Sequence, residues 1–149
     1  MVAKFHRLFV EALEKGRDIP ILLIRLLLAY GFYGPAMKKL EHFDNIIKWF
    51  DGMGIPFPTL NAYMATGTEI AGFILLALGL ATRYISIPLM VIMVVAIKTV
   101  HWEHGFSAGD NGFEIPLYYM IMLLGLVFSG GGRLSVDHLI ARFFSKDEA

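Results

Sequence analysis

Four apolar runs of roughly membrane-spanning length constrain the fold of this chain more than any other feature. They extend over about 19–37, 61–81, 84–100 and 114–128. An α-helix rises ~1.5 Å per residue, so about 20 apolar residues cross the ~30 Å hydrocarbon core of a bilayer. Hydrophobic residues make up 56% of the chain and charged residues 17%, whereas soluble domains have about 45–50% and about 25%. We therefore expect an all-α integral membrane protein in which residues 1–149 form a single four-helix bundle.

The two ends of the chain have a different helical pattern, in which apolar residues recur among charged ones. The apolar positions are Phe5, Leu8, Phe9, Ala12 and Leu13 between Met1 and Asp18, and Leu134, Val136, Leu139, Ile140, Phe143 and Phe144 in the tail. Both segments predict amphipathic helices that lie on the membrane surface. For the first segment, a frayed basic tail is the alternative.

The distribution of lysine and arginine predicts how the bundle is oriented. Basic residues are concentrated in the N-terminal segment, in the short turn at Arg83 and in the C-terminal tail. Of the other two connections, the first carries Lys38, Lys39 and Lys48, and the second, residues 101–113, carries none. The positive-inside rule therefore places both termini in the cytoplasm and these two connections outside.

Charged side chains interrupt three of the apolar runs and mark a candidate site. Glu69 lies in the middle of the second run, Arg25 in the first and Lys98 in the third. An ionised group at the centre of a bilayer costs about 2.5 kcal/mol or more unless it is paired or faces water. Helical spacing puts Glu69 on a small-residue face with Gly72, which points it into the bundle. We expect Arg25 or Lys98 to compensate its charge.

Two interpretations of these charges are open. They form an ion-pair network that fixes the register of the helices, or they line a polar pocket for a ligand or a proton path. The charges are four with Glu114, more than register alone requires, which favours the pocket. His101 and His104 are spaced so that they can share a metal ion. Histidine is, however, also common at membrane interfaces, and this pattern is a weak signal for a metal.

Composition and the lack of certain motifs exclude other functions. The formal net charge is zero, which gives no indication of a nucleic-acid partner. The chain has no cysteine and therefore no disulfide or cysteine-ligated iron–sulfur cluster of its own. No haem-attachment, flavin or nucleotide motif is present, and no residue can be assigned a catalytic role.

Seven short motifs follow one another in a characteristic order. They are Arg25-Leu26-Leu27 with Gly31, Gly34 and Lys38 or Lys39; Met53-Gly54-Ile55-Pro56; Glu69-Ile70-Ala71-Gly72; Leu78-Gly79-Leu80-Ala81-Thr82-Arg83; His101 with Gly105-Phe106; Gly112-Phe113-Glu114; and Gly131-Gly132-Arg133-Leu134-Ser135-Val136-Asp137. Over about 20–137, the chain resembles the DoxX family of small four-helix bacterial membrane proteins. The resemblance implies a multi-pass protein of the bacterial inner membrane. Named members are associated with thiosulfate:quinone oxidoreductase, a quinol oxidase, or oxidative-stress and thiol-homeostasis complexes.

The resemblance implies a quinone- or quinol-binding or redox-associated subunit of a membrane oxidoreductase complex. The expected cofactor-binding residues are Arg25, Lys39, Glu69, Lys98, His101 and Glu114. Arg25 or Lys98 would donate a hydrogen bond to a quinone carbonyl. Glu69 or Glu114, with His101, would exchange the accompanying protons. The alternative is a non-enzymatic membrane anchor or scaffold for a redox, stress-response or metal-handling partner. In both cases the lipid bilayer surrounds the protein.

Overall fold

The computed structural model describes residues 2–144, and this part of the chain is helical without any β-strand, as expected. The helices are α1 (Val2–Gly16), α2 (Asp18–Glu41), α3 (Phe43–Gly52), α4 (Pro58–Leu78), α5 (Thr82–Ala96), α6 (Glu114–Ser129) and α7 (Val136–Phe144). Between α5 and α6, the chain forms a π-helix, η1 (Ile97–His101), and two short 3₁₀ helices, η2 (Trp102–His104) and η3 (Ala108–Asp110).

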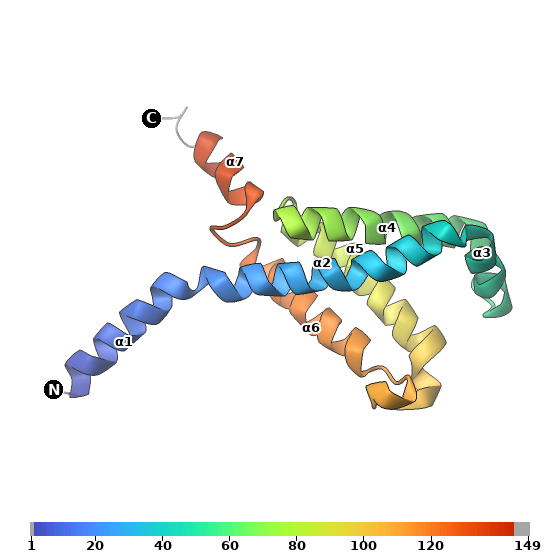
Figure 1. Cartoon of the computed structure of the whole chain (residues 1–149), viewed down its shortest axis with the longest axis horizontal. Coiled ribbons are helices and arrows are strands. Elements are labelled where there is room, and N and C mark those ends of the chain that lie inside the picture. Colours follow the sequence, from blue (N-terminus) through green and yellow to red (C-terminus); the bar gives the residue numbers. More distant parts are fainter. Residues whose placement is uncertain (1, 145–149) are drawn as a thin grey trace.

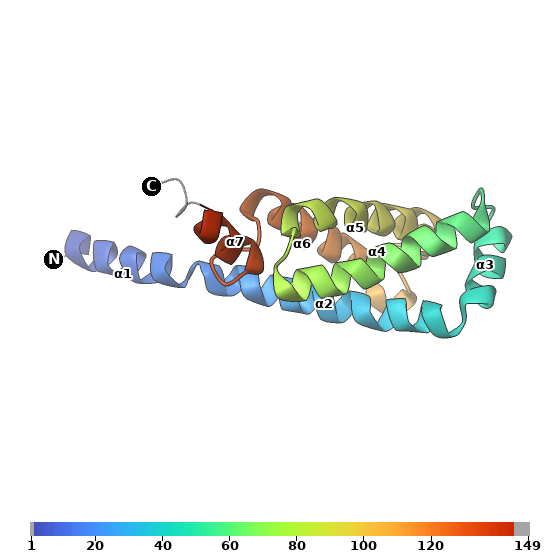
Figure 2. The same cartoon turned by 90° about the horizontal axis from the view of Figure 1, so that it is seen from above.

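Helices α2, α4, α5 and α6 form the body of the molecule (Figures 1 and 2). Three stretches within residues 2–144 are long and apolar enough to cross a membrane: Asp18–Glu41, Pro58–Leu78 and Thr82–His104. They correspond to the first three predicted spans. Helix α6 is also apolar but has 16 residues, which at ~1.5 Å per residue is shorter than a ~30 Å hydrocarbon core.

Proline and glycine set the ends of α4. Pro58 occupies the first turn, where its missing N–H costs no intrahelical hydrogen bond. After Leu78 the backbone turns left-handed at Gly79, with φ of 68°, and the N–H of Leu80 returns to the carbonyl of Leu75. This is the glycine-terminated end that many helices have. It lets α5 begin three residues later and run back alongside the bundle.

The core lies where the four body helices meet. Its fully buried side chains include Leu28 from α2, Leu76 from α4, Leu89 from α5 and Leu123 from α6. Gly72 lies against Leu89, so closely that a Cβ at this position would overlap the leucine side chain. The small-residue face predicted around Glu69 therefore packs against another helix, as small residues do in membrane bundles.

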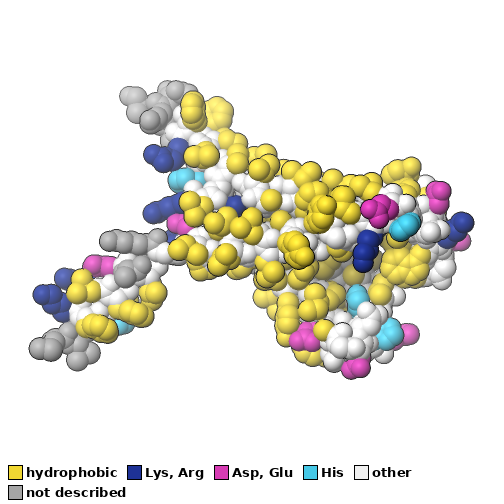
Figure 3. Space-filling model, in the orientation of Figure 1, with side chains coloured by type: hydrophobic (Ala, Val, Ile, Leu, Met, Phe, Trp, Pro, Cys, Tyr) yellow, Lys and Arg dark blue, Asp and Glu magenta, His cyan; other side chains and the backbone are white. Residues whose placement is uncertain are grey.

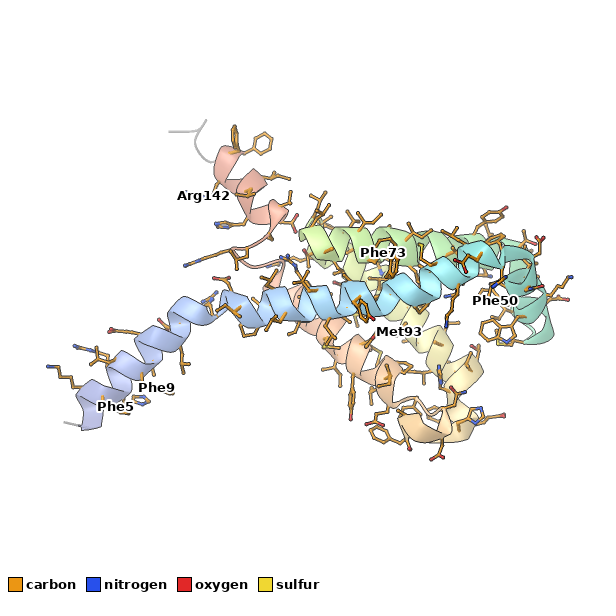
Figure 4. All side chains as sticks on the ribbon, in the orientation of Figure 1. Phe5, Phe9, Phe50, Phe73, Met93 and Arg142 are labelled. Atoms are coloured by element: carbon orange, nitrogen blue, oxygen red, sulfur yellow. The ribbon has the colours of Figure 1, made fainter. Side chains whose placement is uncertain are left out.

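Helices α1 and α7 project from the end of the body that carries both termini (Figures 1 and 2). The helical character predicted for both terminal segments is confirmed, although Met1 lies outside the described residues. On α1, Phe5 and Phe9 are exposed and stack at 6.4 Å between ring centroids (Figure 4). On α7, Phe143 is also exposed. Figure 3 shows that apolar side chains cover much of the visible surface of the body as well.

Candidate functional site

A cavity of about 790 Å³ lies between two arms of the bundle. Helices α2, α3 and α4 line one side of the cavity, and α5, η1 and α6 line the other. Figure 1 shows that these two arms diverge toward the end where α3 lies. The walls are mostly apolar and include Phe50 and Met93, which are labelled in Figure 4. Size and lining are typical of small-molecule sites, which measure about 300–1,000 Å³ and have few polar groups.

The polar feature of this cavity is an ion pair between Lys39 and Glu69. The ammonium Nζ of Lys39 lies 2.5 Å from Oε1 and 2.6 Å from Oε2 of the Glu69 carboxylate. The Glu69 side chain is 3% exposed and that of Lys39 is 15% exposed. A lysine near a helix end can extend its amine to water, but Lys39 turns its amine to the carboxylate. An ammonium has three N–H donors, so a donor remains for a ligand.

Arg25 does not compensate Glu69, and that expectation is wrong. Its guanidinium is buried at the other end of the bundle and donates to four backbone carbonyls. The distances are 3.1 Å from Nε to Leu76, 2.5 Å and 3.0 Å from Nη1 to Gly131 and Leu134, and 3.4 Å from Nη2 to Ala77. Two of these carbonyls belong to the last turn of α4, where carbonyl groups lack intrahelical partners and carry partial negative charge. Within residues 2–144, the arginine makes these bonds and no ion pair with a carboxylate.

Lys98 does not approach Glu69 either. Its side chain is exposed, and it does not line the cavity. The helix face that lines the cavity carries Val91, Val95 and Thr99, and Lys98 is not on it. Residues 97–101 form a π-helix, with hydrogen bonds from i to i+5, and His101 at its end lines the cavity again.

His101 and Glu114, the remaining expected site residues, stabilise the connection between α5 and α6. His101 lines the cavity, and its Nδ1 lies 2.7 Å from the carbonyl oxygen of Asn111. Glu114 does not line it. Its carboxylate accepts hydrogen bonds from the backbone N–H of Ala108 and the hydroxyl of Tyr118, both at 2.9 Å. Lys39, Glu69 and His101 are thus the predicted residues that share the cavity.

The histidine pair does not extend into a metal site. Within residues 2–144, no three histidine or acidic side chains gather in an arrangement that could hold a metal ion. His101 instead forms the hydrogen bond described above, and His104 is exposed. The weak metal pattern at these two positions therefore lacks a third ligand in the described part of the chain.

Sequence reasoning missed Tyr119 as a cavity residue. Its ring packs edge-on against Phe32, at 5.6 Å between centroids, and occupies the space left by Gly31. Helix α6 is apolar on all sides, so no periodicity distinguishes the face that points inward. The glycine at position 31, noted for its place in a motif, was the available signal for a close approach of another helix.

Fold and site together describe an all-helical membrane protein with a ligand-sized cavity inside its bundle. The DoxX family model matches residues 21–102, and the chain belongs to this family. No solved structure matches the chain significantly.

Three relatives cover most of the chain. An uncharacterized protein of Haemophilus influenzae is 31% identical over 137 residues, which are 87% of this chain and 88% of the relative. The Bacillus subtilis protein named "Putative oxidoreductase CatD" is 26% identical over 86% of this chain and 92% of its own length. The Escherichia coli "Inner membrane protein YphA" is 26% identical over 82% of this chain and 91% of its own. The family and the last of these names agree with an integral membrane protein.

Proposed function

We propose that this DoxX protein is a quinone- or quinol-binding, redox-associated subunit of an oxidoreductase complex in the bacterial inner membrane. The observation that carries the proposal is the cavity with the Lys39–Glu69 pair on its wall. A quinone combines an apolar ring and tail with two carbonyl oxygens that accept hydrogen bonds. An apolar cavity that offers one ammonium donor beside one carboxylate fits those requirements.

The residues of the cavity have separate roles in this proposal. A bound quinone supplies two-electron, two-proton chemistry, with electrons from a partner subunit or its substrate. Lys39 donates a hydrogen bond to a carbonyl oxygen, and Glu69 holds or releases a proton beside it. Phe32, Phe50 and Met93 exclude water from the ring. His101, at the connection between α5 and α6, exchanges protons with the solution outside.

Two further observations support a redox role in the membrane. The Bacillus subtilis relative carries a name that provisionally assigns it to the oxidoreductases, and the Escherichia coli relative is named for the inner membrane.

In our proposal, α6 is the fourth span, and the bilayer is locally thinner or the adjoining residues complete the crossing. Helices α1 and α7 lie on the cytoplasmic surface with their exposed aromatic residues in the interface.

Thermal stabilisation by a short-chain ubiquinone or menaquinone analogue tests the site. A ligand that binds only the folded state stabilises it by RT ln(1 + [L]/Kd), about 2.7 kcal/mol at a hundredfold excess over Kd. We expect the analogue to raise the melting temperature of the purified protein in detergent. Lys39→Met and Glu69→Gln should each reduce the shift, measured from that variant's own unliganded melting temperature. The double variant Lys39→Met/Glu69→Gln removes both charges together, so no unpaired ion is left in the cavity wall.

Lys98→Met is the matched control, because it removes a lysine that does not line the cavity. It should leave the quinone shift unchanged. A shift that survives both Lys39→Met and Glu69→Gln would place the quinone elsewhere. If no quinone stabilises the protein, and purification from native membranes yields a stoichiometric partner without quinone, the protein is an anchor or scaffold instead.

A further inference from the structure

A second cavity, of about 490 Å³, lies at the opposite end of the bundle, near the start of α2 and the beginning of α7. Its lining includes Arg17, Arg83 and Arg133 around the turn Gly130–Gly132. In Figure 3, lysine and arginine side chains gather where α7 leaves the body. We propose that this groove, called here the arginine groove, binds the phosphate of an anionic phospholipid headgroup. This inference does not depend on the quinone site.

The two acidic side chains of the arginine groove are already engaged. Asp18 accepts the backbone N–H of Arg133 at 2.9 Å and lies 3.7 Å from its guanidinium Nε. The carboxylate of Asp137 accepts the backbone N–H groups of two residues at the start of α5, at 2.7 and 3.0 Å. Within the described chain, Arg17 and Arg83 form no ion pair. Arg17 and Arg83 are therefore the cations of the groove without a paired carboxylate in the described structure, and the three arginines of the groove outnumber its two aspartates.

The turn beside these arginines carries backbone N–H donors, with the Asp18 carboxylate lying against Gly132. Gly130 and Gly132 have φ of 70° and 73°, a backbone conformation that favours glycine. The guanidinium of Arg83 lies directly over Gly130, where a side chain would contact it. In residues 2–144, the backbone N–H groups of Gly131 and Gly132 have no hydrogen-bond acceptor. Backbone N–H groups next to planar guanidinium groups are the donors that proteins use to bind phosphate.

The position of the groove favours a lipid over a soluble phosphate. It lies where α4 turns into α5 and where α6 ends, so it meets the level at which the apolar helices leave the hydrocarbon. Tyr84, on its lining, is 79% exposed, and Phe128, on the last turn of α6, is 76% exposed. Exposed aromatic residues at the ends of spans contact the interface, and acyl chains can pack against them. Anionic lipids also attract basic residues at the cytoplasmic surface.

Titration of the purified full chain in a neutral detergent tests the proposal. The probes are dioctanoyl-phosphatidylglycerol, dioctanoyl-phosphatidylcholine and inorganic phosphate, and the readout is the melting temperature against probe concentration. Phosphatidylglycerol should stabilise the protein more than the other two. Arg83→Gln should weaken its apparent affinity about fivefold, the effect of one cation near an anionic membrane surface. Arg17→Gln should act in the same direction, and Arg83→Lys should retain most of the binding.

Lys48→Gln is the control, because it removes an exposed cation on α3, at the far end of the body. It should leave the titration unchanged. Equal stabilisation by phosphatidylglycerol and phosphatidylcholine would overturn the proposal. A loss of phosphatidylglycerol affinity in Lys48→Gln as large as that in Arg83→Gln would also overturn it. Equal stabilisation by inorganic phosphate would identify a soluble anion and overturn the lipid assignment. Should Arg83→Gln fail to fold, Arg17→Gln alone decides between these outcomes.

Discussion

Two cations of this bundle, the partly buried Lys39 and the buried Arg25, are stabilised in different ways. Lys39 is paired with a carboxylate on the cavity wall, whereas Arg25 is surrounded by backbone carbonyls. The planar guanidinium has five donors and can satisfy several acceptors at once. An ammonium is a compact charge that pairs well with one carboxylate. The arginine is therefore suited to join chain segments, and the lysine leaves its partner accessible to a ligand.

Removal of the Glu69 carboxylate should leave the ammonium of Lys39 without a counter-ion. Breaking a buried ion pair by removing one partner typically costs about 3–5 kcal/mol, because an uncompensated charge remains. We expect Glu69→Ala to lower the free energy of unfolding in detergent by an amount in that range. Glu69→Ala combined with Lys39→Met should recover part of the loss.

Adding Arg25→Leu to Glu69→Ala should recover nothing, since the arginine bonds to carbonyls at the other end of the bundle. Double-mutant cycles separate these cases, because residues that share no partner have nearly additive effects. If Arg25→Leu restored stability to the Glu69→Ala protein and Lys39→Met did not, the pairing of Lys39 with Glu69 would be contradicted.

The sequence identified which residues are unusual but not which of them meet. Glu69 and Arg25 stand out because charges are rare in membrane spans. Their partners depend on how far two helices are shifted along each other, and spacing within one helix does not report that shift. Lys39 was among the expected site residues but was not predicted to be the partner of Glu69. The position of Lys98 was mispredicted because the cavity faces the side of α5 that carries Val91 and Val95, and spacing along one helix does not say which side that is.

The start of α5 is stabilised by a residue far away in the chain. Asp137, at the start of α7, caps α5 by accepting the N–H groups of Ala81 and Thr82. Its own N–H donates to the carbonyl of Gly79 at 3.0 Å. These bonds join the turn between α4 and α5 to the C-terminal segment. Local sequence rules look for a cap within a few residues of the helix start, so they do not find this one.

Asp137→Ala should therefore destabilise the protein by about 0.5–2 kcal/mol, the usual cost of losing a helix cap. Asp137→Asn keeps one acceptor oxygen and should cost less. Thermal melting in detergent measures both variants. Asp110→Ala removes an exposed carboxylate that makes no side-chain hydrogen bond in the described structure, and it should melt like the parent. An Asp137→Ala protein as stable as the parent would show that the cap contributes little.

Helix periodicity predicted the main elements well. Three expected spans appear as long apolar helices, and both terminal patterns appear as α1 and α7. The aromatic segment after the first span forms α3, which ends at Gly52, before Gly54 and Pro56. The observed helix boundaries differ from the expected ones by several residues. The first span, for example, continues past Pro35 to Glu41 as α2. No local signal distinguishes the π-helix from a regular α-helix.

For the molecule as a whole, charge predicts orientation. Arg17, Arg83 and Arg133 gather at one end of the body, next to α1 and α7. The positive-inside rule assigns that end to the cytoplasm. The chain has no native cysteine, so single cysteines can be labelled without interference. In intact cells, a membrane-impermeant maleimide should label cysteines at positions 48 and 110, and it should reach those at 4 and 144 only after lysis.

Labelling of positions 4 and 144 from outside, with 48 and 110 protected, would show that the orientation is opposite to the predicted one. It would also place the cavity on the cytoplasmic side. Labelling of positions 48 and 4 together would show that α2 does not cross the membrane.

The divergence of the two arms, and with it the cavity, could not be predicted from sequence. It depends on how α2 with α4 and α5 with α6 pack as pairs, while each helix pattern describes only one face.

The carbonyl cage around Arg25 also has a consequence for the order in which the protein is made. The Nη1 acceptor at Leu134 lies 109 positions after the arginine. At about 5–20 residues per second, a ribosome needs roughly 5–20 s to cover that distance. Until then, Arg25 has the α4 carbonyls at most, and its long side chain can reach the headgroup water. The glycine turn before α7 is thus synthesised last among the segments that hold Arg25. We expect a chain that ends before Gly131 to lack two of the four acceptors of this arginine and to be less stable for that reason.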